Sequence, residues 1–303
     1  MKVGWLSDYN KKDLLGGASI SNSLMIKEGE DRGHTIVFQD YKTFNQEELE
    51  DMDLVVLSNI NMFQKKHIQW VIDNKPFVKY EHDYCFCKFR NVRCEEQCPV
   101  ICKPAEIFED LFMKSKLNIF ISKLQQDIYN RFFNNLLFRN ALILPPPIDT
   151  KLYFADKKLQ KKDTYLYLGL IAEHKGVAEI IEEGLRLKQL GKTVVFAGKG
   201  VHKVLMERIK ENFKYLGEIE HEDVPKLLRQ YQHFFVAPKM RETFGIVVLE
   251  AILSGCNIVR FKNSKEMGID SYRDIKTIVE LGNNSKHIFW NKIEGCDYYD
   301  KKN

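Results

Sequence analysis

The sequence lacks any long apolar segment. No stretch approaches the roughly 20 consecutive apolar residues that a membrane-spanning helix needs. Residues 1–6 are too few, and are followed too soon by polar residues, to form a signal peptide. A low-complexity tract and an internal repeat are also absent. These absences predict an intracellular, cytoplasmic protein, with peripheral contact to an anionic membrane surface left open.

An excess of charge of one sign is missing as well. The formal net charge of the 303 residues is +4, and Lys and Arg are interspersed with acidic residues. This balance argues against nucleic acid as a partner and is compatible with an anionic substrate. Seven cysteines in a chain of this length do not indicate a secreted disulfide scaffold.

The chain instead alternates short apolar runs with longer amphipathic ones. This alternation predicts α/β architecture with mainly parallel sheets covered on both faces. The expected strands are 2–6, 35–38, 54–57, 77–80, 118–122 and 141–144 in the first half, then 165–168, 193–197, 215–216, 234–237 and 257–260.

The length favours two domains of about 150 residues each, and the three prolines at 145–147 mark the boundary between them. We expect an N-terminal Rossmann-like, acceptor-side domain at 1–149 and a C-terminal Rossmann-like donor domain at 150–285. A tail at 286–303, rich in aromatic residues, is expected to pack back on the first domain. Two such doubly wound domains would face each other across a cleft.

Two carboxylates in the second half carry most of the functional information. Glu242 and Glu250 are separated by seven residues, and the segment between them turns from polar to apolar, as at the start of a helix. The free N–H groups of a helix N-terminus suit a phosphate. Carboxylates beside a phosphate site are unusual unless the ligand also carries hydroxyl groups, and therefore a sugar nucleotide is the first hypothesis.

Glycine-rich turns support a phosphate-bearing ligand. Gly16 and Gly17 follow the first strand, where adjacent glycines allow close approach to a phosphate, although a plain flexible loop is an equal alternative. Lys175 stands where a helix is expected to begin, a position that suits an anion better than the helix dipole; a solvated surface lysine is the alternative. The dinucleotide pattern G-x-G-x-x-G is absent, so NAD or FAD binding is not indicated.

Together these features resemble the GT-B glycosyltransferases, in particular the retaining enzymes of glycosyltransferase family 4. The likeness is clearest over residues 165–259, where a Gly…Lys-Gly loop, an Ala-Gly-x-Gly turn and Pro-x3-Glu-x-Phe-Gly-x4-Glu-Ala occur in the family's order. It is looser in the first half.

The resemblance implies a fold of two Rossmann-like domains and the transfer of a sugar from a nucleotide-diphosphate sugar to a hydroxyl acceptor, with retention. Glu250 would accept hydrogen bonds from the donor ribose, and Glu242 would contact the transferred sugar. Lys175 and the backbone at Gly16, Gly17, Thr243, Phe244 and Gly245 would hold the diphosphate. Glu242 and His82 would be the catalytic residues. His82 would lie near the sugar, with a structural or metal-binding histidine as alternatives. No metal cofactor would be required for catalysis, because protein cations stabilise the leaving group.

One departure from the family pattern bears directly on catalysis. Leu170 stands where an arginine normally follows the glycine of the first loop of the second domain. The alternatives to a transferase are therefore a sugar-nucleotide-binding or scaffold protein with weak or no catalysis, and a GT-B nucleotide-sugar epimerase. The donor base and sugar, the acceptor (glycan, lipid-linked or protein) and the oligomeric state are not readable from the sequence.

Five of the seven cysteines share residues 85–102: Cys85, Cys87, Cys94, Cys98 and Cys102. Thiolates at this density in an intracellular protein suggest a structural zinc ion, although the spacing fits no standard zinc finger. Disulfides and free thiols are the alternatives. Any such site would brace a long loop in the N-terminal domain.

Overall fold

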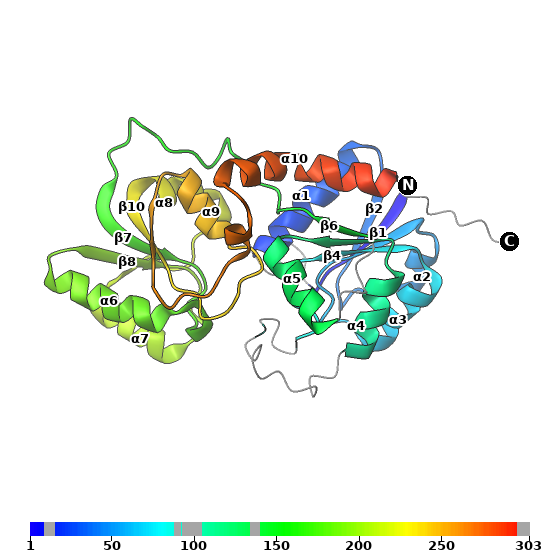
Figure 1. The fold of residues 1–303 in the computed structure, drawn as a ribbon, viewed down its shortest axis with the longest axis horizontal. Coiled ribbons are helices and arrows are strands. Elements are labelled where there is room, and N and C mark those ends of the chain that lie inside the picture. The colour runs from blue at the N-terminus through cyan, green and yellow to red at the C-terminus, as the bar shows by residue number, and fades with distance from the viewer. Residues whose placement is uncertain (9–15, 88–91, 93–104, 134–139, 296–303) are drawn as a thin grey trace. The chain divides into compact units, whose positions relative to one another are not determined.

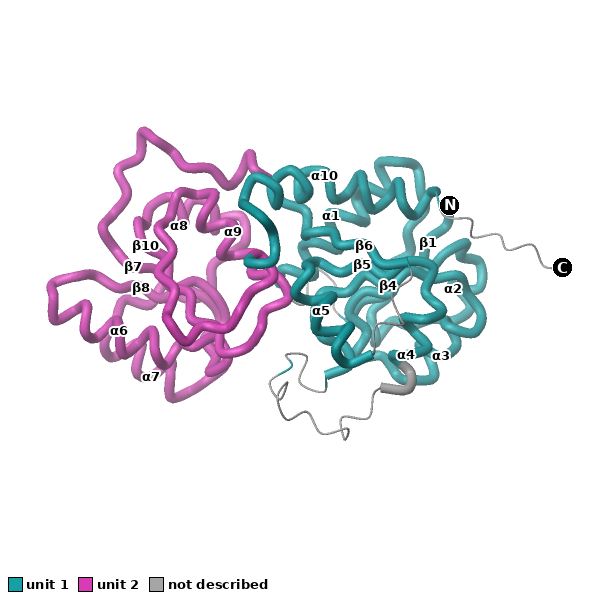
Figure 2. Tube along the Cα trace, in the orientation of Figure 1, with its two compact units in different colours: residues 1–148, 270–303 teal, residues 149–269 magenta. Residues whose placement is uncertain are grey.

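The chain forms two compact units, which Figure 2 distinguishes by colour. Unit 1 consists of residues 1–148 and 270–303, and unit 2 of residues 149–269. The computed structural model describes residues 1–8, 16–87, 92, 105–133 and 140–295, and for residues 105–107 it describes the backbone only. Each unit is built around its own parallel sheet.

Unit 1 contains a six-stranded sheet in the order β2-β1-β3-β4-β5-β6, with every neighbouring pair parallel. Its strands are β1 (Lys2–Leu6), β2 (Thr35–Gln39), β3 (Leu54–Leu57), β4 (Phe77–Glu81), β5 (Leu117–Phe120) and β6 (Ala141–Ile143). Its helices are α1 (Gly17–Asp31), α2 (Gln46–Glu50), α3 (Lys65–Asn74), α4 (Ala105–Lys114), α5 (Lys123–Phe132) and α10 (Ile275–Glu294).

Helices cover both faces of this sheet (Figure 1). Successive residues of a strand point to opposite faces. Leu6 joins the hydrophobic core that α2, α3 and α4 close on one face. Trp5, its neighbour in β1, packs against Phe289 of α10 on the other face, with the two rings tilted and their centroids 5.7 Å apart. Unit 1 is therefore doubly wound.

Helix α10 belongs to unit 1 as a single element. It packs along α1, and the indole nitrogen of its Trp290 donates a 2.8 Å hydrogen bond to the carbonyl oxygen of Met25. Trp290 is fully buried. The donor-domain limit expected at 285 falls inside this helix, whereas the compact unit 2 ends at Ile269.

Unit 2 contains a five-stranded sheet in the order β11-β10-β7-β8-β9, again parallel between every neighbouring pair. Its strands are β7 (Lys162–Leu168), β8 (Thr193–Ala197), β9 (Lys214–Tyr215), β10 (Tyr231–Val236) and β11 (Asn257–Arg260). Its helices are α6 (Val177–Gln189), α7 (Lys203–Asn212), α8 (Val224–Gln230) and α9 (Ile246–Leu253), with short 3-10 turns at Glu173–Lys175, His221–Asp223 and Gly268–Ser271, the last of which runs into unit 1.

The two faces of this second sheet are covered by different helices. Tyr167, Phe196 and Phe235 form one hydrophobic core with α6 and α7. Helices α8 and α9 pack on each other and on β10. The predicted fold class, α/β with two doubly wound parallel sheets, is confirmed.

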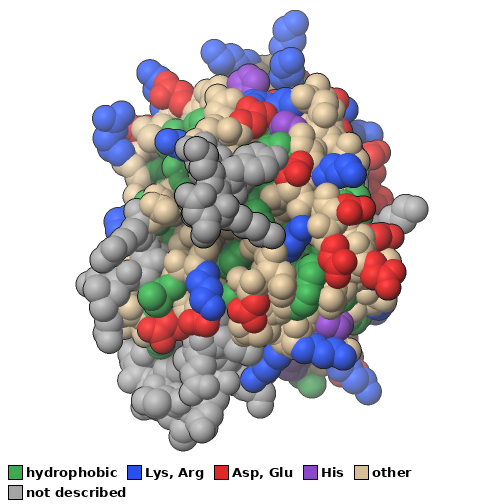
Figure 3. Space-filling model, turned by 90° about the vertical axis from the view of Figure 1, so that its right-hand side faces the viewer, with side chains coloured by type: hydrophobic (Ala, Val, Ile, Leu, Met, Phe, Trp, Pro, Cys, Tyr) green, Lys and Arg blue, Asp and Glu red, His purple; other side chains and the backbone are tan. Residues whose placement is uncertain are grey.

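The surface charges agree with the balanced composition. Among the described side chains of the face shown in Figure 3, basic and acidic residues are interspersed. Within the described residues, no helix combines the length and apolar character that crossing a bilayer requires.

Candidate functional site

The loop after β10 brings Glu242 to the carboxyl end of the sheet of unit 2. Its backbone is fixed on both sides: the amide of Glu242 donates to the carbonyl of Glu266 at 3.1 Å, and the amide of Gly268 donates to the carbonyl of Glu242 at 3.0 Å. Gly245 then takes a left-handed conformation (φ +95°) as the N-cap of α9. Glycine adopts this conformation without strain, so the chain turns directly from the loop into the helix.

Lys175 meets Glu242 at this edge. Its ammonium nitrogen lies 2.7 Å from Oε1 of Glu242, and both side chains remain about a quarter to a third exposed (31% and 25%). The next residue, Gly176, has φ +69°, and a Cβ there would lie 1.8 Å from the carbonyl oxygen of Ala237. The lysine loop is therefore pressed against the loop after β10, and this contact holds the two charged groups together.

The sequence placed both residues at a ligand site, and the structure shows that they contact each other. The pair offers a cation for a phosphate and a carboxylate for hydroxyl groups within one hydrogen-bond length. Tyr167 lies nearby: burial, and then the Glu242 charge, raise the pKa of its hydroxyl. That hydroxyl donates a 2.7 Å hydrogen bond to the carbonyl oxygen of Leu170, the residue that replaces the expected arginine.

Glu250 forms a second polar cluster, on α9. It is only 7% exposed, and burial raises the pKa of its carboxyl group to about 7, although a hydrogen bond from the Tyr153 hydroxyl opposes that rise. Nε2 of His221 lies 3.4 Å from the Tyr153 hydroxyl and 3.9 Å from Oε1 of Glu250. Sequence reasoning missed Tyr153 and His221, because neither lies in a recognisable motif.

The remaining predicted residues of unit 2 surround the start of α9. Phe244 is buried, and its carbonyl oxygen accepts a 2.9 Å hydrogen bond from the amide of Ile269. Thr243 precedes it in the same loop, and Gly245 caps the helix. Their expected role in diphosphate binding stays a prediction.

In unit 1, Gly16 is the extended N-cap of α1 and makes no side-chain cap, and Gly17 is the first helical residue. The preceding residues 9–15 lie outside the described part. The structure thus places the glycine pair at the N-terminus of a 15-residue helix, where unpaired backbone N–H groups favour anions. A contact with a diphosphate remains an expectation.

His82 follows β4 and is buried, with 6% of its surface exposed. Its Nε2 lies 3.1 Å from Oδ1 of Asn22, and its ring lies 4.2 Å from that of Tyr80. Burial, and then the positive charge of Lys79, lower the pKa of His82 to about 3. The imidazole is therefore neutral at physiological pH and suits hydrogen bonding better than proton transfer. The predicted catalytic role stays a prediction.

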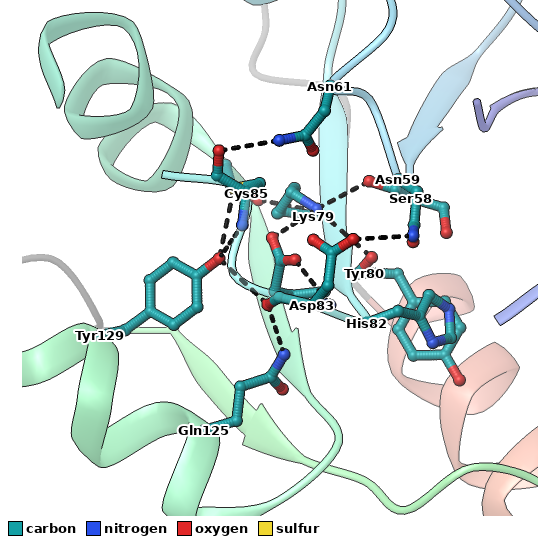
Figure 4. Close-up of polar contacts among 12 residues, drawn as sticks. Ser58, Asn59, Asn61, Lys79, Tyr80, His82, Asp83, Cys85, Gln125 and Tyr129 are labelled. Atoms are coloured by element: carbon teal, nitrogen blue, oxygen red, sulfur yellow. Dashed lines mark hydrogen bonds and ion pairs between the residues drawn. The ribbon is translucent and has the colours of Figure 1, made fainter. Parts of the chain in front are cut away.

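A buried ion pair lies beside His82 and was not foreseen. Nζ of Lys79 lies 2.8 Å from Oε2 of Glu81, with both side chains fully buried. Nζ of Lys79 also donates a 2.8 Å hydrogen bond to the carbonyl oxygen of Ser58. The contact between Lys79 and Glu81 is an ion pair by its distance, but its geometry is not that of a hydrogen bond. Figure 4 shows Asn59, Asn61, Asp83 and Cys85 around Lys79. The sequence signal for this pair was the presence of two charged residues, Lys79 and Glu81, in the otherwise apolar strand β4.

The cysteine-rich segment is described only in part. Cys85 and Cys87 are buried, and neither forms a disulfide with another described cysteine. The Tyr129 hydroxyl donates a 3.3 Å hydrogen bond to Sγ of Cys85, and burial raises the pKa of this thiol well above its usual range. Cys94, Cys98 and Cys102 lie outside the described residues.

Zinc gains no support from this arrangement. Within the described residues, no group of three or more His, Cys, Asp or Glu side chains is arranged to hold a metal ion.

One protein-family model matches unit 2. Residues 149–269, the same residues that form unit 2, match the family model described as glycosyl transferases group 1. No curated protein sequence matches the chain at a significant level.

Solved structures with the same fold span nearly the whole chain. HepE from Anabaena, in complex with UDP and glucose, is 15% identical with a TM-score of 0.62, over 98% of this chain and 96% of its own. AviGT4, a glycosyltransferase of avilamycin A biosynthesis, is 14% identical with a TM-score of 0.57, over 97% of each chain. Sucrose-phosphate synthase from Thermosynechococcus elongatus is 11% identical with a TM-score of 0.62, over 97% and 94%.

At these identities the similarity establishes the fold, which is GT-B with two Rossmann-like domains. The match to glycosyl transferases group 1 covers residues 149–269, which are less than half of the chain.

Proposed function

We propose that the protein transfers a sugar, with retention of anomeric configuration, from a nucleotide-diphosphate sugar to a hydroxyl acceptor, as glycosyltransferases of family 4 do. The observation that carries this proposal is the Lys175–Glu242 pair, with the buried Glu250 carboxyl group in the same unit that matches glycosyl transferases group 1. These groups suit a ligand that combines phosphate with hydroxyl groups. UDP-sugars are the first donors to test, because HepE is described in complexes with UDP and with UDP-glucose.

Charge development in the reaction explains the pairing. Breaking a glycosyl–phosphate bond leaves negative charge on the diphosphate and oxocarbenium character on the sugar. Fixed cations and N–H groups aimed at the leaving group supply the main stabilisation. In the free protein the Lys175 ammonium group forms an ion pair with the Glu242 carboxylate. On donor binding the lysine turns to the diphosphate, and the carboxylate accepts hydrogen bonds from sugar hydroxyl groups.

The test is turnover of labelled UDP-, GDP-, ADP- and CMP-sugars, with product formation and hydrolysis followed separately. We expect one donor class to be consumed, and the anomeric configuration of any glycoside product, read by NMR, to match that of the donor. Glu242→Gln should depress turnover and spare donor binding. Inversion would refute retention. Binding of a nucleotide sugar without turnover or hydrolysis would instead favour a binding protein, the alternative suggested by Leu170.

A further inference from the structure

Three side chains from separate segments of unit 2 meet at Glu250. Tyr153 comes from the segment that enters β7, His221 from the 3-10 turn before α8, and Glu250 from α9. Tyr153 is 4% exposed and Glu250 is 7% exposed, so their polar atoms need partners inside the protein. The function described above uses Glu250 and leaves the other two without a role.

The ionised state of Glu250 gives the hydrogen bonds in this cluster a direction. A phenol carries one proton, and when Glu250 is ionised the Tyr153 hydroxyl donates that proton to the carboxylate. In that state Nε2 of His221, 3.4 Å from the same hydroxyl oxygen, is the donor to it. The protonated nitrogen is assigned by this argument. The chain therefore runs from His221 through Tyr153 to Glu250.

Helix α8 holds the first two members in place. The guanidinium group of Arg229 donates a 2.7 Å hydrogen bond to the carbonyl oxygen of Leu152 and lies 4.7 Å from the centre of the Phe154 ring. These contacts fix the residues on each side of Tyr153. His221 lies in the turn that leads into α8, and α8 packs on α9. The same helix thus positions both residues against Glu250.

We propose that Tyr153 and His221 are positioning residues that orient the Glu250 carboxylate for the ribose hydroxyl groups of the donor, so that they determine selectivity for ribose over deoxyribose. This inference rests on the proposed function. A carboxylate offers about four acceptor positions. Tyr153 occupies one of them and prevents rotation of the group, and the others accept from the 2′- and 3′-hydroxyl groups.

The experiment compares the dissociation constants of UDP and 2′-deoxy-UDP by calorimetry. The wild type should prefer UDP. The ratio of interest is the dissociation constant of 2′-deoxy-UDP divided by that of UDP. Tyr153→Phe removes only the hydroxyl group, and it should lower this ratio by about three- to tenfold, the usual range for one hydrogen bond. His221→Ala should lower the ratio in the same direction, whereas His221→Gln, which keeps an N–H donor, should restore part of it.

Tyr165→Phe is the matched control. This tyrosine lies in β7 and stacks on His233 and Phe235, away from Glu250, so the ratio should stay at the wild-type value. If Tyr153→Phe weakens UDP and 2′-deoxy-UDP equally, the residue has only a structural role and the inference is overturned. If neither ligand binds the wild type, GDP, ADP and CDP are compared with their deoxy forms; binding of none of them overturns the proposed function itself.

Discussion

Glu250→Gln should change the pH dependence of stability. In the unfolded chain this carboxyl group titrates near its ordinary pKa of 4.5, whereas burial raises its pKa to about 7 in the folded protein. The folded state therefore binds the proton more tightly, and protonation stabilises the fold. That contribution is complete below about pH 4.5 and is lost as the pH rises through 7.

The magnitude follows from the same pair of pKa values. Their separation corresponds to about 3 kcal/mol, because one pKa unit is worth about 1.4 kcal/mol. Glutamine has nearly the same shape and does not titrate. Relative to Glu250→Gln, the wild type should lose about 3 kcal/mol in free energy of unfolding between pH 4.5 and pH 8.

Urea denaturation at several pH values, followed by far-UV circular dichroism, measures this difference. All three tryptophans, at positions 5, 70 and 290, belong to unit 1, so tryptophan fluorescence reports unit 1 separately. Glu207→Gln, at an exposed site on α7, is the control for a Glu-to-Gln change outside the core. If the difference for Glu250→Gln depends on pH no more than the difference for Glu207→Gln does, the assignment of a raised pKa to the buried carboxyl group is refuted.

Three further predictions address the binding site, its loop and the buried ion pair. Nucleotide affinity should rise with pH up to about 7 and then level off, because ribose hydroxyl groups bind the ionised form of Glu250; calorimetric titrations from pH 5.5 to 8.5 measure this. Gly176→Ala should destabilise unit 2 by roughly 2 kcal/mol more than Gly191→Ala in thermal unfolding. Both glycines have a positive φ, but only at Gly176 would a Cβ lie within 1.8 Å of a backbone oxygen. Lys79→Met should destabilise unit 1 by about 3–5 kcal/mol in urea titrations followed by tryptophan fluorescence, because this change leaves the buried Glu81 charge unpaired. Adding Glu81→Leu should recover most of the loss. Equal losses in the single and the double variant would show that the ion pair is not the cause.

Much of the fold was predictable, because buried parallel strands are short apolar runs and their connections carry amphipathic helices. All eleven described strands overlap expected runs, although β7 and β10 each begin three residues earlier than expected. Helix α10 was missed: its buried residues, Trp290 among them, are interleaved with charged residues, and its partner α1 is distant in sequence. The expected domain limit at 285 falls inside this helix.

The candidate site was predictable only where function leaves a local pattern. Glu242, Glu250 and Lys175 lie in such patterns, and the structure brings Lys175 and Glu242 into contact. Tyr153 and His221 reach Glu250 from segments far away in the chain, and only the packing of α8 on α9 reveals them.

The most direct test of the account is the affinity of one nucleotide sugar for the wild type and for Glu250→Ala. A donor at a hundred times its dissociation constant should stabilise the wild type by about 2.7 kcal/mol, and calorimetry on the same pair of proteins should show at least tenfold weaker binding to the variant, the cost of losing hydrogen bonds to a charged group. Equal affinity for the two proteins, or no binding of any nucleotide sugar to the wild type, would contradict the claim that unit 2 holds an activated sugar through these carboxylates.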